Sequence, residues 1–232
     1  MNDVFGSAIL DYQEGNYTED LVTSTSISEE DTLALPYLFR AFSEMPSLEQ
    51  TALKLSKGRV LDIGCGAGSH SLHLISKGLN VKSIDISEGA IKVCKLRGLK
   101  SAHVLDVMNE TATFDTLLLL MNGSGIFQSL AHTPLVLKHL ITLLNPEGQI
   151  LIDSSDIKYM YQDDDGGYWM DTNKAYYGEL DYTVRYKGKE ATFRWMYLDF
   201  EHLKIACNQV GLKCELIEKG PHYDFLARLT VD

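Results

Sequence analysis

Apolar and polar positions along the chain follow two alternating patterns. Some stretches are short, continuous apolar runs, such as residues 116–121, and these predict strands buried on both faces of a parallel sheet. Other stretches repeat apolar residues at spacings of three and four, as at Leu137, Leu140, Ile141 and Leu144, and these predict helices that pack on a sheet by one face. Strands that alternate with helices in this way favour an α/β fold.

The predicted elements follow one another regularly from residue 58 onward. One strand is expected to end at Ile63, and further strands are expected at 81–85, 102–105, 116–121, 149–153, 213–218 and 223–230. Helices are expected at 88–97, 133–144 and 199–210. Ser87 is placed to cap the first of these helices, and Gly98 is placed to end it.

The stretch at residues 60–72 is the most informative part of this pattern. A short apolar run that contains Asp62 is followed by Gly64, Gly66 and Gly68, which alternate with small residues before a helical pattern begins. Glycine is needed where the backbone adopts a positive φ or where a ligand approaches closely. A strand–turn–helix of this kind places backbone N–H groups beside a bound cofactor. The turn therefore predicts a site for a small molecule that contains a nucleoside.

Two kinds of cofactor use such a turn. A dinucleotide site needs G-x-G-x-x-G, but here Ser69 stands at the last glycine position and Asp62 lies where a pyrophosphate would be repelled. The form Asp-x-Gly-x-Gly-x-Gly instead resembles motif I of the class I S-adenosylmethionine-dependent methyltransferases, whose cofactor has a cationic end and no phosphate. Asp85 lies 21 positions after Gly64, close to the spacing of about 20 residues at which an acidic side chain reaches a ribose diol.

The resemblance extends over residues 58–232, and the stretch at 143–151 is similar to the turn before the fifth strand of that family. It implies a Rossmann-like three-layer sandwich. Its seven-stranded, mostly parallel sheet would have the order 3-2-1-4-5-7-6, with the last strand antiparallel. The residues that the resemblance implies around S-adenosyl-L-methionine are Asp62, Gly64, Cys65, Gly66, Gly68, Asp85, Ile86, Asp106, Val107, Asn122 and Gly123.

The catalytic edge of such a sheet lies at the carboxyl ends of its strands. Asn122 can donate and accept hydrogen bonds there, and a turn-forming role before Gly123 is an equal alternative. Asp153 could orient an amine or take a proton from the nucleophile, and His222 in the last hairpin is another candidate base. Because the cofactor carries an activated methyl group, the chemistry requires neither a metal nor a covalent nucleophile.

Residues 159–180 form an insertion rich in aromatic and acidic side chains, followed by a predicted hairpin at 181–186 and 190–197. Aromatic and acidic groups together favour cationic ligands, so we expect a lid that selects a small, amine-bearing acceptor. The alternative is ordinary packing beside a solvated acidic loop.

The N-terminal region is expected to be helical and to cover the cofactor, with a helix over residues 28–40 behind a Ser28 cap. Arg40 could pair with the cofactor carboxylate or lie on the surface. The candidate substrate-binding residues of the whole chain are Tyr17, Arg40, Tyr159, Trp169, Tyr177 and Trp195.

These parts predict one domain over residues 1–232. It would comprise a helical N-terminal cap at 1–56, a cofactor-binding core at 57–157 and 198–232, and an insertion or lid at 158–197.

The composition of the chain limits the classes of partner that we expect. The chain has 21 basic and 32 acidic residues, a net charge of −11, and no basic run. A protein that grips phosphate backbones needs clustered Lys and Arg, so nucleic acid is not the expected substrate. The stretch at 121–127 also lacks the Asp/Asn-Pro-Pro-aromatic motif of nucleobase amino-methyltransferases. Without a signal-like N-terminus, a membrane-length apolar run or a C-x-x-C pair, we expect a cytoplasmic protein that has no membrane partner and no metal.

We therefore predict an S-adenosylmethionine-dependent methyltransferase that acts on nitrogen or oxygen of a small molecule by direct in-line displacement. Two alternatives remain open at this point: an NAD- or FAD-dependent oxidoreductase, and a non-catalytic protein that binds S-adenosylmethionine. The oligomeric state is not predicted.

Overall fold

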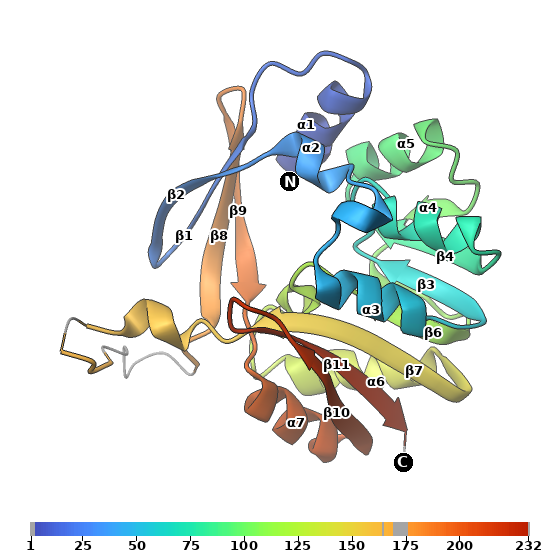
Figure 1. Cartoon of the computed structure of the whole chain (residues 1–232), viewed down its shortest axis with the longest axis vertical. Helices are drawn as coiled ribbons and strands as arrows, with labels where there is room; N and C mark the ends of the chain where they lie inside the picture. The colour runs from blue at the N-terminus through green and yellow to red at the C-terminus, as the bar shows by residue number, and fades with distance from the viewer. Residues whose placement is uncertain (1–2, 164, 169–175, 232) are drawn as a thin grey trace.

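The larger of two β-sheets has the predicted strand order. A computed structural model describes residues 3–163, 165–168 and 176–231. Seven strands lie in the order β10-β11-β7-β6-β3-β4-β5 (Figure 1). Their bounds are β3 Arg59–Ile63, β4 Asn80–Asp85, β5 Ala102–Val104, β6 Phe114–Leu119, β7 Leu144–Ser155, β10 Leu212–Lys219 and β11 Asp224–Val231. Counted from β3 along the chain, this is the order 3-2-1-4-5-7-6. Because β11 alone runs antiparallel to its neighbours in this sheet, the predicted fold class is confirmed.

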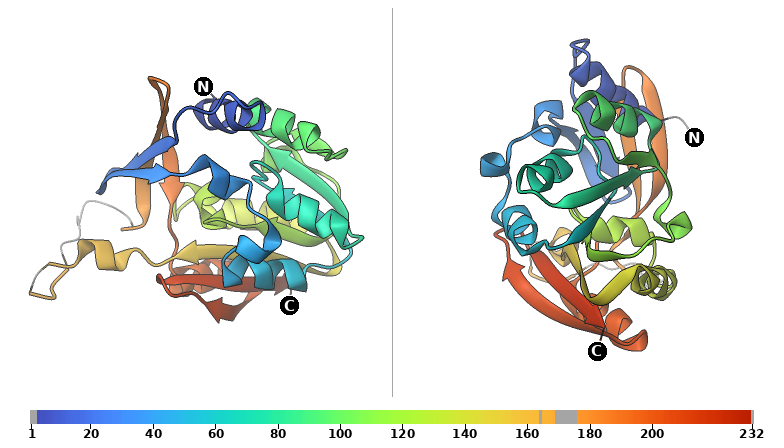
Figure 2. Two further views of the ribbon diagram at one scale, coloured as in Figure 1. Left: turned by 45° about the horizontal axis from the view of Figure 1, so that its top comes forward. Right: turned by 90° about the vertical axis from the view of Figure 1, so that its right-hand side faces the viewer.

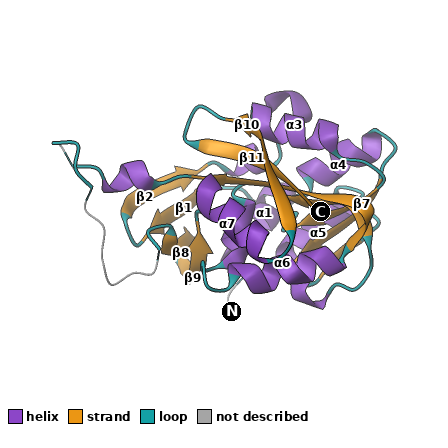
Figure 3. Ribbon diagram, turned by 90° about the horizontal axis from the view of Figure 1, so that it is seen from below, coloured by secondary structure: helices purple, strands orange, loops and turns teal. Residues whose placement is uncertain are grey.

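Helices cover both faces of this sheet and make the three layers (Figure 3). Alternate residues of the central strands point to opposite faces, as a period of two requires. On β7, Leu151 packs with α3 (Ser47–Leu55) and α4 (Ser69–Ser76). Ile150 and Ile152 on the same strand pack with α6 (Thr133–Thr142) and α7 (Phe200–Gln209). The apolar strand residues are therefore buried on both faces.

A second, four-stranded antiparallel sheet stands beside the first, in the order β2-β1-β8-β9 (Figures 1 and 2). Its strands are β1 Leu21–Thr25, β2 Ser28–Leu33, β8 Glu179–Tyr186 and β9 Lys189–Met196. The predicted hairpin of residues 181–197 is confirmed as β8 and β9. The second sheet as a whole was not predicted, because half of its strands come from the N-terminal region.

The helix predicted over residues 28–40 is wrong. Residues Ser28–Leu33 form strand β2, followed by the short helix α2 (Leu35–Leu38). The Ser28 hydroxyl does accept a backbone hydrogen bond, but it comes from Thr25 at 3.0 Å and closes the turn between β1 and β2. Serine is common both at helix caps and in turns. Here β1 pairs with β8, and this long-range pairing favours a strand at Ser28–Leu33. The N-terminal extension is therefore helical only in part.

The first helix, α1 (Val4–Gln13), fixes the second sheet to the core. Asp3 caps α1, and its carboxylate also accepts hydrogen bonds at 2.9 Å from the Ser87 hydroxyl and from the backbone of Gly89 in α5 (Glu88–Leu96). A Cβ on Gly89 would lie 2.5 Å from the backbone of Gly6, so the two helices touch directly. Ser87 caps α5 and Gly98 follows it with φ +94°, as predicted.

No helix among the described residues is long and apolar enough to cross a membrane.

Candidate functional site

The glycine turn lies at the carboxyl end of β3, between that strand and α4. Gly64, Gly66 and Gly68 all have positive φ values, of 71°, 51° and 81°. A Cβ at Gly66 would meet nothing within 4 Å, and one at Gly64 would meet only the tip of Ile126 at 3.7 Å. A Cβ at Gly68 would lie 2.6 Å from Leu99. The first two glycines therefore border open space, and the third is required by packing beneath the turn.

Asp62 and Cys65 lie beneath this turn. Asp62 is buried and accepts a hydrogen bond of 2.6 Å from the Ser71 hydroxyl of α4. Burial raises the pKa of its carboxyl. Cys65 is also buried, and its sulfur lies 3.7 Å from that of Cys94 in α5. These buried side chains connect the turn to α4 and α5.

Asp85 joins the glycine turn to the next loop. One oxygen of its carboxylate accepts the backbone N–H of Gly66 and the other accepts that of Ser87, both at 2.9 Å. Burial raises its pKa, and the two backbone hydrogen bonds oppose that effect. The next residue, Ile86, leaves 74% of its surface exposed. A fixed carboxylate and an exposed apolar side chain thus stand together at the end of β4.

The end of β5 carries the next two predicted residues. Asp106 is exposed and accepts the backbone N–H of Met108 at 2.9 Å. Val107 is buried, and its carbonyl oxygen lies 2.8 Å from Nε2 of His139.

The loop after β6 is held by Asp153 and Asn122. The Asp153 carboxylate, on β7, accepts the backbone N–H groups of Met121 at 3.0 Å and of Gly123 at 2.9 Å. Burial raises the pKa of Asp153 to about 7, although the hydrogen bond from Gly123 acts in the opposite direction. Asn122 has a φ of 61°, and its side-chain amide donates to the carbonyl of Met196 in β9 at 3.1 Å. Asn122 therefore ties the large sheet to the second sheet.

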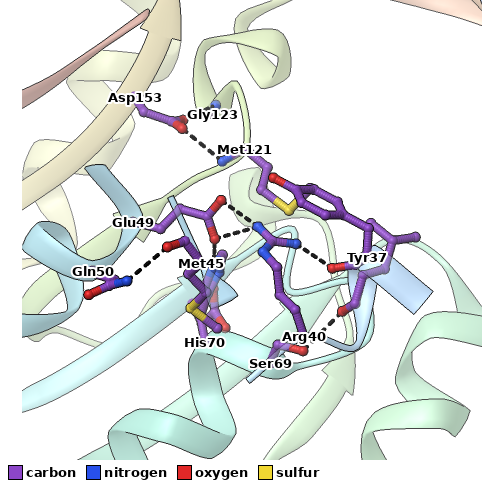
Figure 4. A network of polar contacts seen from close by, with 12 residues as sticks. Tyr37, Arg40, Met45, Glu49, Gln50, Ser69, His70, Met121, Gly123 and Asp153 are labelled. Atoms are coloured by element: carbon purple, nitrogen blue, oxygen red, sulfur yellow. Dashed lines mark hydrogen bonds and ion pairs between the residues drawn. The ribbon is translucent and has the colours of Figure 1, made fainter. Parts of the chain in front are cut away.

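A buried ionic cluster, which we call the Arg40–Glu49–His70 cluster, lies next to this loop (Figure 4). Arg40 is 7% exposed and pairs with Glu49 of α3, so the expectation that it could lie on the surface is wrong. Glu49 also contacts Nε2 of His70 in α4 at 2.7 Å. Burial raises the pKa of Glu49, but His70 and Arg40 outweigh that effect and the net pKa is lowered. Nε of Arg40 is buried without a hydrogen-bond partner among the described atoms.

Tyr37 is the residue of this region that the sequence did not single out. Its ring lies over the guanidinium of Arg40 at 3.9 Å and remains 40% exposed. Burial raises the pKa of its hydroxyl; the charge of Arg40 lowers it, and those of Glu49 and Asp153 raise it again. Figure 4 shows Tyr37 on the side of Arg40 that faces Met121. The helix α2 thus places a phenol beside the acidic groups at the sheet edge.

The other predicted substrate residues are dispersed. Trp195 packs on Gly125 of the 3₁₀ helix η3 (Gly123–Phe127), because a Cβ built there would overlap its indole ring. Tyr177 donates to Asp156 at 2.8 Å, just beyond β7. Tyr17 is exposed and donates to Asp20 at 2.8 Å, which leaves it in the loop before β1.

Two further candidates lie together at the turn between β10 and β11. Tyr159 stacks on Tyr223 of that turn with ring centroids 4.8 Å apart, and His222 beside it is exposed. No hydrogen bond described for these residues connects them to the glycine turn or to Asp153. Trp169 lies outside the described residues, as do Asp164 and Asp171 of the insertion.

Comparison with known proteins shows the family to which the chain belongs. The profile of a family described as "Methyltransferase domain" matches residues 54–197, more than half of the chain. A SAM-dependent methyltransferase from Bacteroides fragilis, solved in complex with S-adenosyl-L-homocysteine, is 43% identical. The alignment covers 99% of this chain and 94% of that chain, with a TM-score of 0.92. This chain belongs to the S-adenosylmethionine-dependent methyltransferases.

The enzyme class and the cofactor predicted from the glycine turn are thereby confirmed, in preference to a dinucleotide oxidoreductase and to a non-catalytic binding protein. More distant relatives match only in part. The ubiquinone biosynthesis O-methyltransferase of Bordetella parapertussis is 41% identical over 59 residues, which are 25% of this chain and 24% of that protein. Its namesake from Xylella fastidiosa is 30% identical over 112 residues, 43% of each chain. The methyltransferase thus spans about a quarter of the length of the first relative and under half of the second.

Proposed function

We propose that this methyltransferase transfers the methyl group of S-adenosylmethionine to nitrogen or oxygen of a small molecule by direct in-line displacement. The observation that carries the proposal is the second sheet, which stands across the carboxyl ends of the core strands. Its strand β9 is bound to the loop after β6 through Asn122 and through Ser124, whose hydroxyl donates to the carbonyl of Met196 at 3.0 Å. An edge enclosed in this way suits a small acceptor better than a folded polymer.

Charge supports the same proposal. The chain has a net charge of −11, whereas a surface that binds nucleic acid needs clustered basic side chains. The two partial relatives are named for O-methylation in ubiquinone biosynthesis, which is small-molecule chemistry. They leave the choice between nitrogen and oxygen open for this enzyme.

The residues present fit the cofactor. We assign the open space above Gly64 and Gly66 to S-adenosylmethionine, since a side chain at either position would enter it. The Asp85 carboxylate, fixed by two backbone N–H groups, has oxygen lone pairs left to accept both ribose hydroxyls. Exposed Ile86 and Asp106, at the ends of β4 and β5, are the residues that would bind the adenine.

The chain itself needs to supply little chemistry. The cofactor brings an activated methyl group, so the protein has to hold the acceptor in line and exclude water, which can contribute about 7–11 kcal/mol. Asp153 is the group at this edge that is best placed to accept a proton from the acceptor, because its pKa of about 7 lets it act near neutral pH. Asn122 acts as a positioning residue, because its side chain is engaged with β9.

The test is incubation with methyl-labelled S-adenosylmethionine and a cell extract separated into metabolite, protein and nucleic-acid fractions. Label in the metabolite fraction supports the proposal. Label that accumulates in protein or nucleic acid overturns it. An Asp85→Ala variant, which is expected to bind the cofactor poorly, controls for labelling by enzymes of the extract.

A further inference from the structure

Three aromatic rings lie together on one face of the second sheet. Tyr182 of β8 pairs with Phe193 of β9, and Trp195 is two residues further along β9, so the three side chains share a face. Their ring centroids are 5.6 Å apart for Tyr182 and Phe193, 5.7 Å for Phe193 and Trp195, and 6.0 Å for Tyr182 and Trp195. Each ring is only partly buried. We call these three residues the aromatic wall.

The wall faces the carboxyl ends of the core strands, because both ends of its strands are anchored there. On the same face of β8, Val184 and Tyr186 are buried in a cluster with Ala8 of α1 and with Ala67 of the glycine turn. At the opposite end, Trp195 packs on Gly125 of η3. The wall therefore extends from the glycine turn to the loop after β6.

Charged groups around the wall are unevenly distributed. The arginines of β8 and β9 occupy the alternate positions of these strands, on the opposite face, where Arg185 pairs with Glu30 and Arg194 pairs with Glu179 and Asp181.

Among the described residues of β8 and β9, the single basic side chain on the wall's own face is Lys189, which is exposed at the tip of the hairpin. Arg40, at the core edge, is already neutralised by Glu49. Among the described residues of these two strands, an anionic acceptor would therefore find no unpaired cation beside the three rings.

From this juxtaposition we infer that the acceptor is a small amine with an apolar body, bound through its cationic and apolar parts to Tyr182, Phe193 and Trp195. Aromatic faces attract ammonium groups within about 6 Å of the ring centroid, and the attraction grows when the site is desolvated. This inference rests on the proposed function and names the class of its substrate.

Trp195 is the specificity-determining member of the wall. A Cβ at Gly125 would lie 2.1 Å from the indole ring, so the glycine fixes how close the indole lies to the loop that the Asp153 carboxylate holds. Gly125→Ala is expected to displace the indole and to impair acceptor binding. The same substitution made in a Trp195→Leu background is expected to have little further effect, because the ring that it would displace is gone.

The test uses the whole protein loaded with S-adenosylhomocysteine and three probes of one shape: 2-phenylethylamine, 2-phenylethanol and 3-phenylpropionate. Calorimetry is expected to show the amine binding at least about tenfold more tightly than the carboxylate, which corresponds to about 1.4 kcal/mol. Trp195→Leu should remove this preference, and Trp195→Phe should retain most of it. Arg194→Gln, on the opposite face of the same strand, is the matched control and should retain all of it.

Equal or tighter binding of the carboxylate, no binding of the amine in the millimolar range, or an unchanged preference in Trp195→Leu would each overturn the inference. Unaltered affinity for S-adenosylhomocysteine shows that a variant is folded. If Trp195→Leu does not fold, Gly125→Ala is the second variant that disturbs the aromatic wall. The labelling experiment separates the two proposals. Label in an anionic metabolite would overturn the inference of an amine acceptor but would still support a small-molecule methyltransferase. Label in a polymer would overturn both proposals.

Discussion

The cofactor side and the acceptor side of the proposed site differ in the kind of residue that forms them. On the cofactor side, the Asp85 carboxylate accepts the backbone N–H groups of Gly66 and Ser87, which joins the glycine turn to the end of the neighbouring strand β4. On the acceptor side, large aromatic side chains stand on a sheet whose strands come from distant parts of the chain. The cofactor side can hardly change without losing its ligand, whereas the acceptor side can exchange side chains with the core sheet intact. Outside both sides, the Arg40–Glu49–His70 cluster joins the segment after α2 to α3 and α4.

The largest expected effect comes from this cluster. Glu49→Ala leaves Arg40 buried without its counter-ion, which is expected to lower the free energy of unfolding by about 3–5 kcal/mol. Glu215→Ala removes a solvent-exposed pair with Arg228 and should cost less than about 1 kcal/mol. Urea unfolding of both variants measures the difference. Equal, small losses would show that the buried pair contributes no more to stability than the exposed pair.

The same pair predicts a response to acid. Because the folded-state pKa of Glu49 is lowered, its contribution to stability is present above the unfolded pKa and is lost as the pH falls through the folded value. The stability difference between the wild type and Glu49→Ala should therefore shrink below about pH 4.

Within the glycine turn, Gly68 should be far less tolerant than Gly66. Gly68→Ala places a methyl group 2.6 Å from Leu99 at a φ of 81°, and an overpacked, strained site is expected to cost about 2–4 kcal/mol of unfolding free energy. Gly66→Ala meets no atom within 4 Å, so its cost is limited to backbone strain, about 1 kcal/mol, although it should weaken cofactor binding. Chemical denaturation and calorimetry with S-adenosylhomocysteine separate the two effects. A reversed order of stability would contradict the assignment of open space above Gly66.

Asp85 tests the cofactor side directly. Asp85→Ala removes charge-assisted hydrogen bonds and is expected to weaken S-adenosylhomocysteine binding by about 1.5–3 kcal/mol. Asp106→Ala, at an exposed position, should cost less, which makes it the natural comparison. Unchanged affinity in Asp85→Ala would remove that residue from the site.

A pH dependence of stability is expected at Asp153. Its pKa is about 7 when folded and about 3.9 when unfolded, so the native state retains a proton that the unfolded state releases. Wild-type stability relative to Asp153→Asn should therefore fall as the pH rises from about 4 to about 7, by about 4 kcal/mol for the full shift of about three pKa units, and stay level above that range. Unfolding curves at several pH values check this trend. A constant difference would show that the carboxyl titrates normally.

Local signals explain what the sequence could predict. The glycine spacing, the position of Asp85 and the hairpin at β8 and β9 depend on residues close together in the chain, and all three lie where they were expected. Ser28 was misread because the same hydroxyl serves a helix cap and a β-turn, and only the long-range partner β8 distinguishes them.

Long-range contacts explain what could not be predicted from the sequence. The burial of Arg40 depends on Glu49 and His70, which lie on two other helices and follow no shared period. The position of Tyr37 likewise depends on the contact between its ring and the guanidinium of Arg40. Trp195 is a candidate because of its residue type, but its contact with Gly125 joins β9 to η3 across 70 positions of chain, and no sequence pattern indicates such a contact.

The strand order β2-β1-β8-β9 also has a consequence for how the enzyme folds. Val22 pairs with Arg185 of β8, so β1 and β2 are made early in synthesis but cannot join the rest of the second sheet until β8 has been made. Closing so long a loop is slow compared with forming local helices and hairpins. The acceptor side should therefore be the last part of the molecule to form, and the chain should be able to assemble its cofactor side before it can recognise what it methylates.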